Sequence, residues 1–148
     1  MIEEELTGKI IKVFYKVYNT LGYGFIESIY HNAMILELGN AGLRVETQKP
    51  IAVYYEARIV GSFYADLIVE NRVILELKAK EKLVEAHEVQ LINYLRATEI
   101  EIGLLLNFGK TPEFKRKFFS NMNKSLNGIS SSGNLLEDLF VKHPFESA

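Results

Sequence analysis

The sequence predicts an α/β domain in which helices flank a mixed β-sheet. Three observations lead to this prediction: helical segments begin the chain, strand-like segments follow them, and a further helical segment separates these strands from a last, apolar one. A strand, helix and strand in that order imply a right-handed crossover, so the last strand lies parallel to a neighbour. At 148 residues the chain is long enough for one hydrophobic core.

Apolar residues at intervals of three and four predict the helices. The first helix covers residues 6–21 and ends at Gly22. The second covers residues 26–38 and ends in the glycine-containing segment 39–42. The third covers residues 81–97, with apolar side chains available to its inner surface.

Strands are predicted at residues 44–55, 58–69, 72–80 and 102–108. Pro50 indicates that the first of them is broken or lies at an edge, because proline cannot donate a backbone hydrogen bond to a neighbouring strand. The last segment is almost continuously apolar, which is typical of a strand buried on both faces.

The second and third strands form a hairpin around residues 70–72, where Asn71 tolerates a left-handed backbone conformation. With a three-residue loop, Asp66 lies opposite Glu76 at a Cβ separation of about 5 Å. A two-residue loop would instead place the Asp66 carboxylate on an apolar face. We therefore favour the three-residue loop.

Asp66, Glu76 and Lys78 are the candidate catalytic residues, since alternation along the strand puts Glu76 and Lys78 on one face. Two adjacent carboxylates repel each other and stay ionised most easily with a cation between them. Mg²⁺ or Mn²⁺, bound by Asp66, Glu76 and the backbone carbonyl of Leu77, fits these oxygen ligands. Lys78 would then orient or deprotonate the attacking water and stabilise the transition state of phosphodiester hydrolysis.

The simpler interpretation is that these three side chains form the polar face of an ordinary hairpin. Short motifs match by chance often, and for an arbitrary Asp and Glu-x-Lys this interpretation would be preferred. The apolar runs 67–69 and 73–75 weaken it, because they predict a strand pair that is buried on both faces. Charged side chains are unfavourable in such a buried strand pair, so their presence there favours a functional role.

Residues 24–30 match a Gly-x-x-Glu-x-x-Tyr signature. Further blocks accompany it in order along the chain, at residues 21–25, 48–51, 65–67, 76–78, 87–95 and 103–109. On these blocks the chain resembles the GxxExxY proteins, a group placed in the PD-(D/E)xK nuclease superfamily, over about residues 5–116.

The resemblance implies a restriction-endonuclease-like fold, with a PD-(D/E)xK mixed β-sheet core flanked by helices in a domain of residues 1–122. It implies a Mg²⁺- or Mn²⁺-dependent nuclease that hydrolyses DNA or RNA phosphodiester bonds by attack of a metal-activated water. The expected partner is nucleic acid, DNA rather than RNA, with a homodimer left open. The alternative is a non-catalytic module that keeps the fold and binds nucleic acid or protein.

Five further residues receive roles from the resemblance. Glu27 completes the metal shell, Gln90 orients the water or Lys78, and Tyr94 contacts the substrate phosphate. Gln48 and Tyr30 are assigned to substrate binding. The alternative is that Gln90 and Tyr94, four apart on a helix, only tie the helix to the sheet, and that Glu27 only complements the helix dipole.

Composition limits the classes of protein. The chain has no cysteine, which excludes disulfides and thiolate metal sites, and no apolar stretch of the roughly 18 residues that spans a membrane. We therefore expect a cytoplasmic protein. The net charge of −2 provides no general attraction to phosphate, so nucleic acid must meet a local patch. The one dense basic and aromatic cluster, residues 110–119, is equally consistent with a solvated edge strand or helix face.

The C-terminal part of the chain differs in composition. Residues 123–133 are rich in Asn, Ser and Gly and predict a linker, and residues 134–148 predict a short helical tail. A helix this short does not fold alone, so it docks either on this domain or on a partner.

Overall fold

The computed structural model describes residues 3–125. The predicted tail and all but the first three residues of the predicted linker lie outside the described residues. Along the chain the elements are α1 (Glu4–Leu21), α2 (Glu27–Asn40), β1 (Val45–Thr47), β2 (Pro50–Tyr55), β3 (Arg58–Tyr64), β4 (Leu67–Val69), β5 (Val73–Lys78), α3 (Glu85–Arg96), β6 (Ile102–Phe108), β7 (Pro112–Phe118) and the 3₁₀ helix η1 (Asn121–Asn123).

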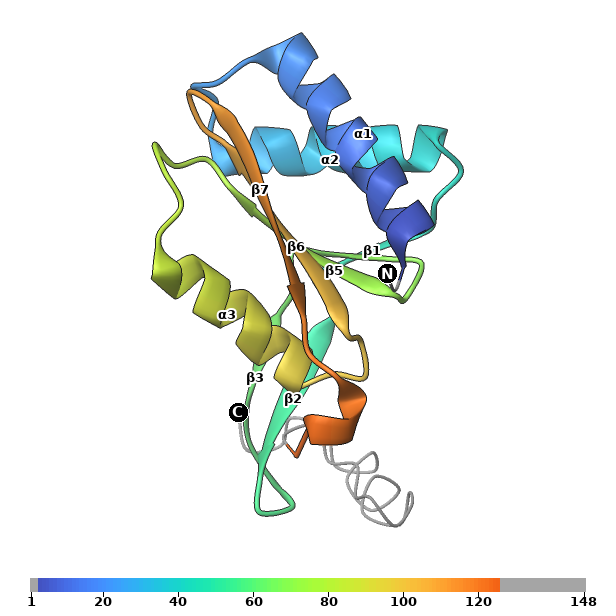
Figure 1. Cartoon of the computed structure of the whole chain (residues 1–148), viewed down its shortest axis with the longest axis vertical. Helices are drawn as coiled ribbons and strands as arrows, with labels where there is room; N and C mark the ends of the chain where they lie inside the picture. Colours follow the sequence, from blue (N-terminus) through green and yellow to red (C-terminus); the bar gives the residue numbers. More distant parts are fainter. Residues whose placement is uncertain (1–2, 126–148) are drawn as a thin grey trace.

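Five strands form one mixed sheet in the order β1-β4-β5-β6-β7. β5 and β6 are parallel and the other neighbours are antiparallel, which confirms the crossover through α3. β2 and β3 form a separate two-stranded sheet that extends away from the main one (Figure 1). The predicted α/β architecture, a mixed sheet flanked by helices, is therefore confirmed.

Helices cover both faces of the five-stranded sheet, with α1 and α2 on one side and α3 on the other (Figure 1). Alternation along β5 divides its side chains between the two layers: Val73, Leu75 and Leu77 belong to the core under α1 and α2, and Ile74 belongs to the core under α3. Glu76 and Lys78 continue the α3 face of β5. Among the described residues, no helix is long and apolar enough to span a membrane.

The strand prediction was wrong for residues 58–69. The structure ends β3 at Tyr64 and begins β4 at Leu67, because β3 pairs with β2 whereas β4 pairs with β1 and β5 in the main sheet. The chain crosses from one sheet to the other through Ala65 and Asp66. The predicted strand 44–55 is likewise divided before Pro50, as that proline indicated.

The hairpin between β4 and β5 has the predicted register. Leu67 lies opposite Leu75 and Val69 lies opposite Val73, so the loop contains three residues. Its first two residues, Glu70 and Asn71, have φ values of 53° and 54°. The left-handed conformation expected of Asn71 is therefore confirmed, and Glu70 shares it.

The structure also defines the start of the third helix and the secondary structure of residues 110–119. α3 starts at Glu85, four residues later than predicted, after the segment that leaves β5. The basic and aromatic cluster at residues 110–119 lies largely in β7, an edge strand of the main sheet, which is one of the two structural alternatives considered for it. Phe114 packs against the core, and Lys117 forms an ion pair with Glu88 of α3 at 2.5 Å.

Gly109 tests the packing at the end of β6. A Cβ atom there would lie 2.4 Å from the backbone oxygen of Lys80, which cannot move away as a flexible side chain can. We expect Gly109→Ala to lower the free energy of unfolding by about 1–3 kcal/mol. Gly8→Ala, at an exposed position of α1 with no atom within 4 Å of the added Cβ, should instead raise the free energy of unfolding by about 0.5–1 kcal/mol. Denaturant unfolding measures both, and an equal effect of the two variants would contradict this packing.

Candidate active site

Asp66 and Glu76 meet where the chain passes between the two sheets. The backbone N–H of Asp66 donates to Glu76 Oε2 at 2.9 Å, and the backbone N–H of Leu77 donates to Asp66 Oδ2 at 2.9 Å. The Glu76 carboxylate therefore accepts the backbone N–H of Asp66, and the Asp66 carboxylate accepts the backbone N–H of the residue that follows Glu76. These two bonds stand in place of strand hydrogen bonds, because β4 begins only at Leu67, and they bring the two carboxyl groups together.

The backbone of Leu77 points toward the same place. In a β-strand the N–H and C=O of one residue are directed to the same side, and the Leu77 N–H is directed to Asp66. The Leu77 carbonyl therefore lies on the same side of β5 as Asp66, which precedes the first residue of β4. Two carboxylates and one carbonyl form an all-oxygen donor set of the kind that Mg²⁺ and Mn²⁺ prefer.

A cation site here would be incomplete without ligands from water or substrate. Within residues 3–125, no three His, Cys, Asp or Glu side chains are gathered so as to hold an ion by themselves. Mg²⁺ sites commonly use one or two carboxylates and leave the other positions to water and to phosphate oxygens. The donor set at Asp66 and Glu76 therefore fits an ion that is shared with a phosphate-containing substrate.

Burial and a neighbouring carboxyl group both act on the protonation of Glu76. The side chain is 4% exposed. Burial, followed by the charges of Asp66 and Glu27, raises the pKa of Glu76 to about 8, while the Asp66 N–H and the charge of Lys78 lower it. Since burial and like charge favour the neutral acid, a cation placed at the pair would favour the carboxylate.

A chain of polar contacts joins Lys78 to α3. Lys78 Nζ donates to Gln90 Oε1 at 3.5 Å, and Gln90 Nε2 donates to the Tyr94 hydroxyl at 2.9 Å. The Tyr94 ring stacks on Phe63 of β3, with centroids 3.9 Å apart and planes inclined by 8°. Burial, then the charges of Glu76 and Asp66, raise the pKa of Tyr94 to about 12.

A cavity of about 570 Å³ opens beside the carboxylate pair. Glu27 reaches it from the start of α2, and Gln48 reaches it from the connection between β1 and β2. The complete lining is Glu27, Ser28, His31, Gln48, Tyr64, Ala65, Asp66 and Leu77. The structure thus brings Glu27 and Gln48 to the same place as Asp66, although they come from three separate segments of the chain.

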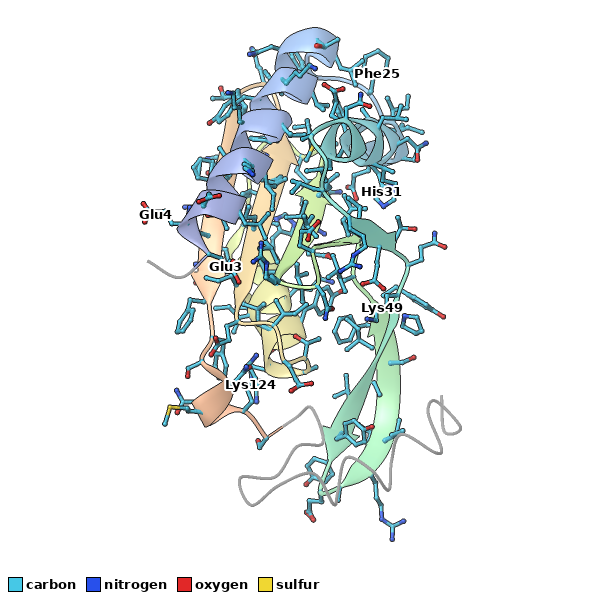
Figure 2. The ribbon with its side chains drawn as sticks, turned by 90° about the vertical axis from the view of Figure 1, so that its right-hand side faces the viewer. Glu3, Glu4, Phe25, His31, Lys49 and Lys124 are labelled. Carbon is cyan, nitrogen blue, oxygen red and sulfur yellow. The ribbon has the colours of Figure 1, made fainter. Side chains whose placement is uncertain are left out.

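His31 was missed by the sequence analysis. Its Nε2 lies 3.1 Å from the backbone oxygen of Asp66, and because a carbonyl only accepts, this nitrogen carries the proton. Figure 2 shows His31 and Lys49 on the same side of the molecule. The signal that could have found His31 is its spacing, four residues after Glu27 on one helix face.

Tyr30 has to be removed from the substrate-binding residues. Its side chain is fully buried, and its ring stacks on Phe108 with centroids 4.3 Å apart. The hydroxyl donates to the Gly22 carbonyl at 2.7 Å and accepts from the Phe25 N–H at 3.2 Å. A substrate cannot reach this side chain, and Tyr30 instead fixes the loop between α1 and α2 to the core. The loop in turn positions Glu27.

His87 contributes to the start of α3. Its Nδ1 accepts from the Val84 N–H at 3.2 Å, so the ring caps the helix. Burial, then the charges of Lys78 and Lys80, lower the pKa of His87.

The raised pKa of Glu76 predicts how the stability of the metal-free protein depends on pH. Because this pKa is about 8 in the folded protein and about 4.3 in an unfolded chain, the folded state holds the proton more tightly between these values. The stability contributed by protonated Glu76 is therefore complete below about pH 4 and is lost as the pH rises toward 8. Denaturant unfolding with a chelator present should show a smaller decline for Glu76→Gln than for wild type. An equal decline in both would contradict this origin.

The comparisons with known proteins agree with this fold. The family model of the PD-(D/E)XK nuclease superfamily matches residues 4–117. No curated protein and no solved structure matched the chain. The family match spans the three α-helices, the five strands of the main sheet except the last residue of β7, and Asp66, Glu76 and Lys78. With its mixed sheet flanked by helices, the chain belongs to the PD-(D/E)XK nuclease superfamily.

Proposed function

We propose that the protein is a divalent-metal-dependent nuclease that hydrolyses phosphodiester bonds. The observation that carries the proposal is the contact of the two carboxylates with the backbone at the facing position: Glu76 accepts from Asp66, and Asp66 accepts from Leu77. Lys78 lies next along the same face of β5 as Glu76. Structural stability alone gives little reason to place two carboxyl groups so close together when one of them, that of Glu76, is buried. The pair is explained if a cation and a phosphate group complete it.

The residues that would hold the cation are Asp66, Glu76 and the Leu77 carbonyl, with Glu27 supporting them from the start of α2. Either Mg²⁺ or Mn²⁺ suits these oxygen donors. When bound, the cation lowers the pKa of a water molecule and stabilises negative charge on the phosphate group. The charge of Glu27 contributes to the raised pKa of Glu76, which supports assigning both residues to one site.

Lys78 would act on the attacking water and on the charge that develops on the phosphate oxygens. Gln90 holds the ammonium group of Lys78 through its side-chain oxygen, so its role is to orient Lys78. Tyr94 holds Gln90 in turn, and its hydroxyl lies within the electrostatic influence of both carboxylates. The Tyr94 hydroxyl accepts from Gln90, and its own O–H would donate to a substrate phosphate.

More narrowly, we assign the chain to the GxxExxY group and favour DNA over RNA as the substrate. The Gly-x-x-Glu-x-x-Tyr segment supports the group, because it places Glu27 at the cavity and Tyr30 in the core below it. A homodimer is compatible with this proposal but is not needed for it, since all the candidate residues come from one chain.

A non-catalytic binding module is the second candidate. The observation that favours it is that both carboxylates accept backbone N–H groups and so have a structural use without any metal. This use explains one oxygen of each carboxylate but does not explain Lys78, Gln90 and Glu27 around them.

Metal binding should be visible as thermal stabilisation. Mg²⁺ or Mn²⁺ relieves the repulsion between Asp66 and Glu76, so either ion should raise the melting temperature by mass action. Asp66→Asn should abolish this response, because the amide can still accept the Leu77 N–H but no longer provides a charged ligand. Differential scanning fluorimetry measures the shift, with Glu81→Gln as the exposed control. An unchanged metal response in Asp66→Asn would favour the purely structural role.

Cleavage should separate Lys78 from the metal ligands. Lys78→Ala should keep the metal-induced thermal shift and lose roughly 100-fold or more in cleavage rate, because Lys78 acts on the reaction and not on the ion. Glu76→Ala should lose both. Lys82→Ala, an exposed lysine before α3, should behave like wild type. Single-stranded, duplex, flapped and branched DNA and RNA should be tested with each ion. If wild type binds the ion but cleaves none of these, or if Lys78→Ala cleaves normally, the binding module is favoured.

A further inference from the structure

The cavity beside Asp66 has walls that hydrolysis does not use. Asp66 and Leu77 form the wall at the carboxylate pair, whereas Ser28, Gln48 and Tyr64 come from other segments and face the same space. We propose that this cavity binds one unpaired nucleotide next to the scissile phosphate, so that the substrate is single-stranded nucleic acid or a frayed strand end. This inference rests on the proposed nuclease function and specifies its substrate class.

The size of the cavity suits one nucleotide. Its volume of about 570 Å³ falls within the range of roughly 300–1,000 Å³ that is typical of sites for ligands of this size. A base inside a duplex is paired and stacked, and removing it from the stack costs a few kcal/mol before it can enter such a site. A nucleotide that is already unpaired avoids that cost.

Tyr64 supplies a stacking surface. Its side chain is 61% exposed and lies at the cavity, in the last residue of β3, opposite Pro50. Alternation fixes its direction, because the preceding residue, Phe63, is turned inward to stack on Tyr94. Tyr64 therefore faces away from the core, and aromatic side chains in such positions stack with bases of any sequence.

The polar side chains of the cavity suit a base edge or a sugar. Gln48 offers both an amide donor and an acceptor, and Ser28 offers a hydroxyl group. Gln48 has a φ of 52°, in the connection that turns the chain from β1 of the main sheet into β2 of the hairpin. These groups recognise an exposed base edge, which pairing would hide in a duplex.

Charge also favours an unpaired nucleotide over the backbone of a duplex. The charged side chains at the cavity include the carboxylates Glu27 and Asp66, and neither lysine nor arginine lines it among residues 3–125. A duplex is held mainly through its phosphates by Lys and Arg. Binding in this cavity therefore depends on stacking and on a cation at the carboxylates, and its salt dependence should be weak.

The test is binding of a fluorescein-labelled oligothymidylate of about ten nucleotides, measured by anisotropy with Ca²⁺ present, against a blunt duplex of the same length as competitor. A gel confirms that the probe stays intact, which keeps binding separate from cleavage. Tyr64→Ala should weaken binding about tenfold or more, because one base loses its stacking partner. Tyr64→Phe should keep the affinity. Tyr55→Ala is the matched control, since Tyr55 is 63% exposed on the same hairpin but does not line the cavity.

Three results would overturn the proposal: no binding of the single strand, equal competition by the duplex, or equal losses in Tyr64→Ala and Tyr55→Ala. The outcome is independent of the nuclease assay. Tyr64-dependent binding without cleavage by wild type would support nucleotide binding in the cavity and refute the nuclease function. If wild type cleaves duplex DNA and Tyr64→Ala cleaves it equally well, nucleotide binding in the cavity is refuted and the nuclease function is supported.

Discussion

The site depends on two hydrogen bonds: the Glu76 carboxylate accepts from the Asp66 N–H, and the Asp66 carboxylate accepts from the Leu77 N–H. Asp66 lies outside any strand, at the point where the chain leaves the β2–β3 hairpin and enters the main sheet. Without a strand partner its backbone N–H would be unsatisfied in a half-buried position, and the Glu76 side chain supplies the acceptor. The Leu77 N–H has the same need and is satisfied by Asp66. Satisfying the backbone and assembling the carboxylates are therefore one arrangement.

This arrangement conflicts with stability in the metal-free protein. Glu76 is buried beside a second carboxyl group, and both effects raise its pKa. A protein under selection for stability alone would more readily use an amide or hydroxyl acceptor at such a position. A group in a cleft whose pKa is strongly shifted by burial and by a specific charged neighbour is a candidate for a functional site. The raised pKa of Glu76 thus supports function on physical grounds that are separate from membership of the family.

The two layers of the fold have different tasks at the site. The α1–α2 layer brings Glu27 and His31 to the cavity, and buried Tyr30 anchors the loop before α2. The α3 layer brings Gln90 and Tyr94 to Lys78. The β2–β3 hairpin links the two layers, since Phe63 packs on Tyr94 of α3 and Tyr64 lines the cavity. The five-stranded sheet lies between the two helical layers and connects these contributions.

Local pattern alone was enough to predict the three helices and the β4–β5 register, and this register brings Asp66 close to Glu76. Alternation and loop length act between neighbours in sequence, so pattern can reveal them. Pattern could not show that β3 and β4 belong to different sheets, since the run from Arg58 to Val69 is continuous and only the choice of strand partner divides it. Pattern also could not reveal that Tyr30 is buried or that His31 contacts the Asp66 carbonyl. Those outcomes depend on how α2 packs against the sheet, and long-range packing is decided by the tertiary structure.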